Sequence, residues 1–159
     1  MDTVFSLNDE HWMQLAYEQA ALAAAQGEIP VGAIIVSQGQ AIGTGYNAPI
    51  KLADPTAHAE IQALRAACQN LSNYRLPEDA TLYVTLEPCT MCAGAIVQSR
   101  IRNLYFGAYE PKSGAVCSCN NIFDVKNGHN HKVEFEGGIL EEECSNLMTS
   151  FFERLRLKP

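Results

Sequence analysis

The sequence predicts an α/β fold, namely a three-layer α/β/α sandwich around a five-stranded mixed sheet. Two observations lead to this prediction. Helices and strands alternate along the chain after an opening pair of strands, and the run "ATLYVTL" at residues 80–86 is continuous and β-branched, as is typical of a strand buried on both faces. The chain has 159 residues and no repeat, linker or low-complexity tract, so a single domain over residues 1–159 is expected.

The first third of the chain is expected to form a helix and a hairpin. The helix covers residues 8–26, with Asn8 as its N-cap and Gly27 as its stop. The stretch "VGAIIVSQGQAIGTGY" contains two β-rich runs joined by a short Gly-Gln turn, which is typical of a hairpin. The stretch "NAPIKLADPT" is expected to form a loop, because its two prolines disfavour regular structure.

Helices and strands alternate through the rest of the chain. The last helix follows Gly138, with acids in its first turn and arginines in its last, as the helix dipole favours. Its apolar positions recur every three or four residues, and Phe151 and Phe152 cannot both face inward. The expected elements are a helix from residue 56 or 57 ("AHAEIQALRAACQ"), a strand at 80–86, a helix opened by Pro88 ("CTMCAGAIVQS"), strands at 101–108 and 131–136, and the last helix with Leu140, Cys144, Leu147, Met148, Phe151 and Leu155 on its apolar face.

Composition and charge exclude several classes of protein. The chain is 47% apolar and 18% charged, as is usual for a globular protein. No segment approaches the roughly 20 continuous apolar residues of a membrane span, and the N-terminus has acids where a secretory signal has lysine or arginine. The net charge of −7 argues against a protein that coats DNA by bulk electrostatics. A cytoplasmic protein is expected, with its six cysteines reduced or bound to metal.

The stretch "TLEPCTMCAG" places two cysteines just after a buried strand. Cys89 and Cys92 are three residues apart at the start of a helix, so they share a face, and the helix N-terminus lowers the pKa of a thiol there. Such a pair could be a disulfide, a redox centre, half of a metal site or plain core. A redox pair is less attractive because the surrounding sequence is unlike thioredoxin.

A zinc site needs further ligands, and His58 is the histidine that supplies one. It begins a helix in "PTAHAE", whereas His11 lies among apolar residues and His129 and His131 lie in a polar loop. His58, Cys89 and Cys92 would leave one coordination position for water, which distinguishes catalytic from structural zinc.

Glu60 follows His58 by two residues and is the expected general base. On a helix these two side chains diverge by about 200 degrees, so Glu60 does not compete for the metal. It would instead reach the water that the metal activates. Together these residues form the H-x-E…P-C-x-x-C signature of zinc nucleobase deaminases.

The other cysteines fit this site less well. Cys117 and Cys119 have a C-x-C spacing that could bind metal, but they have no adjacent helix start and no further ligands. Cys68 and Cys144 fall on apolar helix faces and are expected in the core.

Nearly the whole chain resembles the bacterial tRNA-specific adenosine deaminases. The matching stretches are "EIPVGAIIV", "GYNAPI", "DPTAHAEIQALR", "NYRL", "ATLYVTLEPCTMCAGAIVQSRI" and "FGAYEPKSGA". The resemblance implies a cytidine-deaminase-like fold, a homodimer with one Zn²⁺ per subunit, and conversion of adenosine to inosine at the wobble position (34) of a tRNA anticodon, typically of an arginine tRNA. His58, Cys89 and Cys92 would hold the zinc, and Glu60 would move protons while water replaces the amine at C6 as ammonia.

The resemblance also implies substrate contacts. Asn47 matches a residue that hydrogen-bonds the base, and Val31 and the backbone at Ala59 match positions that line the pocket. Glu110, which replaces an aspartate of the best-known members, and Phe152 are expected to lie near the anticodon loop. Basic residues are expected around the pocket, namely Lys51, Arg100, Arg102, Lys112, Arg154 and Arg156.

Two other functions remain open from the sequence. A deaminase of free guanine, cytidine or a pterin-like compound would share the zinc signature. A non-catalytic zinc-binding partner subunit would be expected to lack the glutamate, and Glu60 is present.

Overall fold

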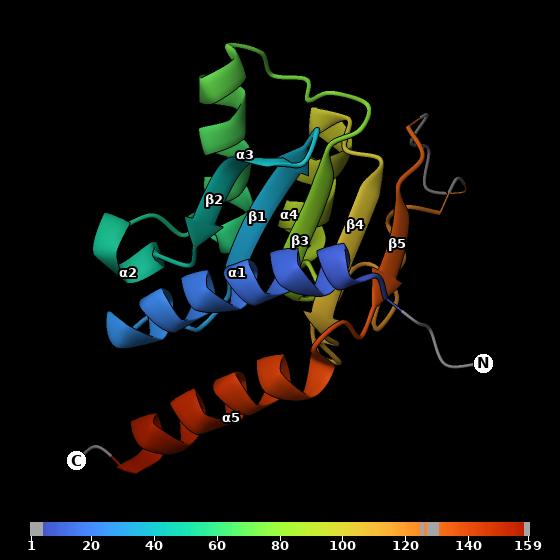
Figure 1. The fold of residues 1–159 in the computed structure, drawn as a ribbon. Coiled ribbons are helices and arrows are strands. Elements are labelled where there is room, and N and C mark those ends of the chain that lie inside the picture. Colours follow the sequence, from blue (N-terminus) through green and yellow to red (C-terminus); the bar gives the residue numbers. More distant parts are fainter. Residues whose placement is uncertain (1–4, 125, 127–130, 158–159) are drawn as a thin grey trace.

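The computed structural model describes residues 5–124, 126 and 131–157, which form a sheet with helices on both faces (Figure 1). The helices are α1 (Leu7–Ala25), α2 (Pro49–Leu52), α3 (Ala59–Leu71), α4 (Thr90–Ser99) and α5 (Glu141–Leu157). The strands are β1 (Gly32–Ser37), β2 (Gln40–Tyr46), β3 (Thr81–Leu86), β4 (Asn103–Ala108) and β5 (Glu134–Gly137). Among these helices, none combines the length and the apolar character that crossing a membrane requires.

The five strands form one mixed sheet, as the sequence predicts, and their order is β2-β1-β3-β4-β5. Strand β1 pairs antiparallel with β2 and β3, whereas β3–β4 and β4–β5 are parallel pairs. Strands β2, β3 and β4 therefore run in the same direction and end at the same edge of the sheet. Helices α3 and α4 follow β2 and β3, so both begin at that edge, where ligands bind in open α/β sheets.

Helices α1 and α5 lie on one face of the sheet (Figure 1). On α1, Met13 and Ala16 are fully buried and pack in a cluster with Ile34 and Tyr83 of the sheet. The N-cap is Ser6, not the expected Asn8, because the Ser6 hydroxyl accepts the Asp9 N–H at 3.1 Å.

Helices α3 and α4 lie on the other face, where small residues allow close packing. Ala63 and Ala67 of α3 are fully buried against β2. A Cβ on Gly43 of β2 would lie 2.5 Å from the Ala63 carbonyl oxygen, so only glycine permits this approach. The tight contact fixes α3, and with it the position of its first residues.

Two helix starts differ from the predictions. Residues 47–56 are not only loop, because Pro49 begins the short helix α2, and a proline at the first helical position loses no backbone hydrogen bond. Helix α3 begins at Ala59, later than expected, because His58 is extended, with φ −74° and ψ 156°. Cys89 is likewise extended, with φ −78° and ψ 176°, and caps α4.

Helix α5 buries a narrower face than its apolar spacing predicts. Cys144 and Phe151 are buried, while Phe152 is 38% exposed. As expected, the two phenylalanines do not both face inward. Leu155 is 44% exposed, and its prediction as an inward-facing residue is wrong. Helix α5 packs mainly on β4 through its first half, so its last turns extend beyond the sheet (Figure 1).

Candidate metal centre and active-site pocket

His58, Cys89 and Cys92 meet where α3 and α4 begin. His58 is the N-cap of α3, Cys89 is the N-cap of α4, and Cys92 lies in the first turn of α4. The His58 Nδ1 atom lies 3.6 Å from the Cys89 Sγ and 3.5 Å from the Cys92 Sγ. The sheet topology thus brings together residues that are 31 and 34 positions apart in the sequence.

The spacing of these three atoms fits a tetrahedral metal ion. Ligand bonds of about 2.3 Å to sulfur and about 2.0 Å to nitrogen, at tetrahedral angles, separate the two ligand atoms by about 3.5 Å. The three ligand atoms of His58, Cys89 and Cys92 all lie within 4.8 Å of one another. Within the described part of the chain, no other group of three or more such side chains meets this criterion.

The two thiols have very different acidities. A hydrogen bond with Cys92 lowers the pKa of Cys89 to about 4, and His58 contributes in the same direction. The same hydrogen bond, together with burial, raises the pKa of Cys92 above its ordinary value. Hydrogen bonding to Cys89 raises the pKa of His58, although burial opposes this. The three groups thus interact strongly with one another, and their geometry suits a bound cation.

Glu60 lies in the first turn of α3 and is only 4% exposed. Burial raises its pKa to about 7, and the charge of Cys89 acts in the same direction. Its carboxyl group is close enough to the Cys92 thiol to raise the pKa of that thiol, so Glu60 lies at the edge of the ligand cluster. A carboxyl group in this position can accept and return a proton beside a bound metal.

A cavity of about 410 Å³ opens over this cluster. Its walls combine apolar side chains with a few polar groups, as is typical of a small-molecule site. Val31 and Asn47, both 7% exposed, are among the residues that line it. The lining residues are Ile29, Val31, Asn47, His58, Glu60, Leu86, Glu87, Cys89, Glu110, Lys112, Ser113, Met148 and Phe152.

Comparisons with known proteins agree with this geometry. A family model described as MafB19-like deaminase matches residues 7–156. The tRNA-specific adenosine deaminase of Haemophilus influenzae is 52% identical over 149 residues, which cover 93% of this chain and 85% of that protein. The chain belongs to the tRNA-specific adenosine deaminase family.

Two further comparisons, one with a sequence and one with a solved structure, match the same family. The tRNA-specific adenosine deaminase of Bacillus subtilis is 43% identical over 150 residues, covering 94% of this chain and 92% of that protein. A solved structure from work on A-to-I editing by tRNA:A34 deaminases superposes with a TM-score of 0.82 at 45% identity, covering 86% of this chain and 98% of that chain. The expected cytidine-deaminase-like α/β fold is thereby confirmed.

The structure separates the predicted RNA-contact residues of this deaminase, and the predicted pocket position Ala59, into two groups. Glu110, Lys112 and Phe152 line the cavity. Ala59 is fully buried in the core and Arg156 is exposed on the last turn of α5, and neither lines the cavity. Of the six expected basic residues, Lys112 alone is among the cavity-lining residues.

Glu87 is a residue of the site that the sequence analysis missed. It is 2% exposed, and its carboxylate accepts backbone N–H groups from Glu110, Val116, Cys117 and Ser118. Burial acts to raise the pKa of Glu87, but the N–H groups of Cys117 and Ser118 and the Ser118 hydroxyl outweigh it and lower the pKa. The signal in the sequence was a charged residue directly after a buried strand, which requires several hydrogen-bond donors.

The remaining cysteines and histidines lie outside the cluster. Cys117 and Cys119 are exposed, Cys68 is partly buried, and Cys144 is buried, so its expected core position is confirmed. The His131 Nε2 atom lies 2.7 Å from the Ile101 carbonyl oxygen. His11 is exposed rather than among apolar residues, and His129 lies outside the described residues.

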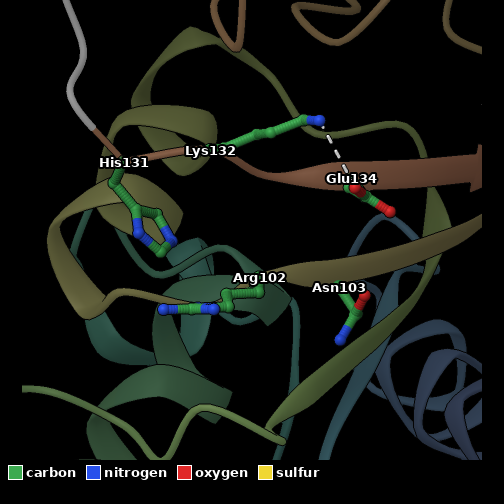
Figure 2. A pocket seen from close by; sticks show the side chains of 5 residues that line it. All are labelled: Arg102, Asn103, His131, Lys132 and Glu134. Atoms are coloured by element: carbon green, nitrogen blue, oxygen red, sulfur yellow. Dashed lines mark ion pairs between the residues drawn. The ribbon is translucent and has the colours of Figure 1, made fainter.

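A second hollow, of about 480 Å³, lies at the opposite edge of the sheet, where β4 and β5 begin (Figure 2). Arg102 and Asn103 line it, together with His131 and an ion pair of 3.4 Å between Lys132 and Glu134 (Figure 2). Although this hollow is larger than the cavity at the ligand cluster, it holds no group of metal-binding side chains among the described residues. The prediction that Arg102 surrounds the active-site pocket is wrong, because the first residues of β4 are at the far edge.

Proposed function

We propose that the protein is a zinc-dependent hydrolase that converts adenosine to inosine at wobble position 34 of a tRNA anticodon, with an arginine tRNA as the expected substrate. The observation that carries this proposal is the cluster of His58, Cys89 and Cys92 with Glu60 beside it under one cavity. Relatives named tRNA-specific adenosine deaminase, at up to 52% identity, supply the substrate class.

Zinc is the metal that the ligand set favours. Two thiolates and one imidazole are ligands that zinc binds well, and three protein ligands are typical of a catalytic site. We expect one ion per subunit, held by His58, Cys89 and Cys92. When bound, zinc lowers the pKa of a water molecule and so supplies a nucleophile at neutral pH.

Glu60 performs the proton transfers in this proposal. Water adds to C6 of the purine while the Glu60 carboxylate takes a proton from it and delivers that proton to N1. The Glu60 carboxylate then takes the second proton from the hydroxyl group on C6 and passes it to the amine. The C–N bond breaks, ammonia leaves, and inosine remains. The burial of Glu60 excludes bulk water from these transfers.

The walls of the cavity provide the contacts for the base. We expect the Asn47 side chain, which lines the cavity, to hydrogen-bond the purine, and Val31 to offer an apolar wall. The backbone at Ala59, which does not line the cavity, is expected to contribute from the start of α3. An unpaired anticodon base can leave its stack at low cost, which a buried site requires. We expect Phe152 to stack on a neighbouring base, and Lys112, Glu110 and Arg156 to contact the anticodon stem-loop.

The proposal includes the assembly and the location of the protein. Residues 1–159 are treated as one deaminase domain that acts on tRNA in the cytoplasm and forms a homodimer. Ile50 and Leu52 on α2 and Met91 on α4 are exposed apolar side chains, and we expect them to contribute to the interface with a second copy. Light scattering on the purified protein should then give twice the mass of one chain.

The test is inosine formation on defined substrates. The purified protein is incubated with an anticodon stem-loop containing adenosine 34, and ammonia and inosine are measured. Free guanine, cytidine and adenosine serve as parallel substrates. Conversion of the stem-loop in preference to the free compounds supports the proposal. Preferred turnover of a free base or nucleoside would instead indicate a small-molecule deaminase, and bound zinc without any turnover would indicate a non-catalytic subunit.

A further inference from the structure

Glu87 connects the end of β3 to a long segment without helix or strand. Its oxygen Oε1 accepts the Glu110 N–H at 3.2 Å and the Ser118 hydroxyl. Its oxygen Oε2 accepts the N–H groups of Val116 at 3.2 Å, Cys117 at 3.0 Å and Ser118 at 3.0 Å. One side chain therefore fixes both ends of residues 110–118.

The hydrogen bonds to Glu87 hold a segment that has no regular secondary structure. Residues 109–121 contain turns but no helix or strand, so no regular ladder holds them. The segment turns back on itself through the Gly114 N–H, which donates to the Glu110 carbonyl at 2.9 Å. It is also bound to the strand end, because the Ala115 N–H donates to the Pro88 carbonyl at 2.9 Å.

The segment crosses directly over the carboxylate. A Cβ added to Gly114 would collide with the Glu87 carboxyl group and would lie 2.5 Å from the Glu110 carbonyl oxygen. The close approach explains why a residue without a side chain stands at this point of the segment.

Residues 110–118 also form one wall of the active-site cavity. Glu110, Lys112 and Ser113 all line it. The position of these three side chains relative to Glu60 thus depends on how the segment is held against Glu87.

Glu87 itself has no capacity left for the chemistry. A carboxylate offers about four lone-pair sites, and here it receives five hydrogen bonds. It is therefore suited to hold the segment in place and unsuited to bind a metal or to move a proton.

We propose that Glu87 is a positioning residue that holds residues 110–118 as the substrate-facing wall of the pocket. The kinetic part of this inference rests on the proposed function, since it concerns the RNA substrate. Loss of the anchor should weaken binding of the stem-loop and leave the proton transfers at Glu60 nearly unchanged.

The main experiment compares the wild type with Glu87→Gln. The amide keeps the size of the side chain but replaces one acceptor oxygen with an NH₂ group that faces backbone donors. We expect KM for the adenosine-34 stem-loop to rise about tenfold or more, with kcat changed by less than about threefold and zinc content unchanged. An unchanged KM, or a fall in kcat alone, would overturn the proposal.

The matched control is Asp79→Asn. The Asp79 carboxylate holds a turn in the same manner, accepting the Gln38 N–H at 2.8 Å and the Ser37 hydroxyl at 2.7 Å, but at the far edge of the sheet. This substitution should leave KM unchanged. If both variants raise KM alike, general loosening of the fold explains the effect and the proposal fails.

Hydrogen exchange tests the anchor without any activity measurement. In Glu87→Gln, the amides of Val116, Cys117 and Ser118 should exchange at least about tenfold faster than in the wild type, while those of β3 keep their rates. This result separates the two proposals, because it holds even if the protein proves to act on another substrate. Unchanged exchange at these three amides would overturn the role of Glu87.

A second pair of variants covers the case in which Glu87→Gln does not fold. Ser118→Ala removes one of the five donors and should raise KM by about threefold. Gly114→Ala retains the carboxylate but displaces the segment from it, and should raise KM as Glu87→Gln does. A wild-type KM in Gly114→Ala would contradict the proposal, since the segment would then work equally well away from Glu87.

Discussion

Glu60 and Glu87 are both buried carboxyl groups at one cavity, yet their surroundings give them opposite properties. Glu87 receives five hydrogen bonds, which outweigh burial and lower its pKa. Glu60 lies beside the anionic sulfur of Cys89, and burial raises its pKa to about 7. The number of donors around a buried acid thus decides whether it holds structure or exchanges protons.

The comparison assigns the two acids different roles in the proposed function: Glu60 takes part in the chemistry, and Glu87 holds the wall that faces the substrate. Glu60 belongs with the metal ligands at the two helix starts. Glu87 belongs with residues 110–118, which face the substrate. Variants of each half should therefore affect different measured quantities.

Cys89→Ala should have the largest effect. It removes one of the three expected zinc ligands without touching the bonds of Glu87, so zinc should fall far below one ion per subunit and inosine formation should disappear. Metal binding is coupled to folding, and the melting temperature should fall as well. Metal analysis and calorimetry check this. A fully active, zinc-replete Cys89→Ala would contradict the ligand assignment.

Glu60→Gln should have the next largest effect. The amide cannot accept the proton, so the rate of inosine formation should fall by up to about 10⁴-fold. Zinc content and the exchange rates of residues 116–118 should stay at wild-type levels. Loss of zinc in this variant would instead show that Glu60 is a ligand, and the contrast with Glu87 would lose its basis.

Lys112→Ala should have a moderate effect, on binding alone. Lys112 lies on the segment that Glu87 holds, and its ammonium group is expected to meet RNA phosphates. The dissociation constant of the stem-loop should rise severalfold, and the slope of log K against log salt should fall by about 1. A salt titration of binding measures both. An unchanged slope would remove the segment from the RNA interface.

Cys117→Ser and Cys119→Ser should have the smallest effect. Both thiols are exposed and neither belongs to the ligand cluster. The Cys117 backbone N–H, which bonds to Glu87, is retained in the serine variant. Zinc content should be unchanged and activity should stay within about twofold of the wild type. Loss of zinc from either variant would reopen the C-x-C pair as a metal site.

The cluster of candidate metal ligands could be predicted from sequence because its signal is local. The spacing of Cys89 and Cys92 places them in one helical turn, and His58 stands at another helix start near a strand end. The sheet topology then brings both starts to one edge, because β2 and β3 end there. In the structure the ligand atoms of His58, Cys89 and Cys92 lie within 4.8 Å of one another.

Other features escaped prediction because they depend on distant partners. The bonds of Glu87 join residues 23 to 31 positions apart, which no local spacing reveals. Helix α2 forms despite two nearby prolines, because Glu28 accepts the N–H groups of Ile50 and Lys51 at its start. The exposure of Leu155 follows from where α5 leaves the sheet.

Single-turnover conversion of an adenosine-34 anticodon stem-loop tests the central claim most directly. Wild-type protein and Glu60→Gln, matched for zinc content, are each used in excess over the RNA, and inosine is measured with time. Because Glu60 is assigned the proton transfers, wild type should form one inosine per stem-loop, and Glu60→Gln should bind the RNA equally well but form almost none. Inosine formation at the wild-type rate by Glu60→Gln, or none by the zinc-loaded wild type, would contradict the account.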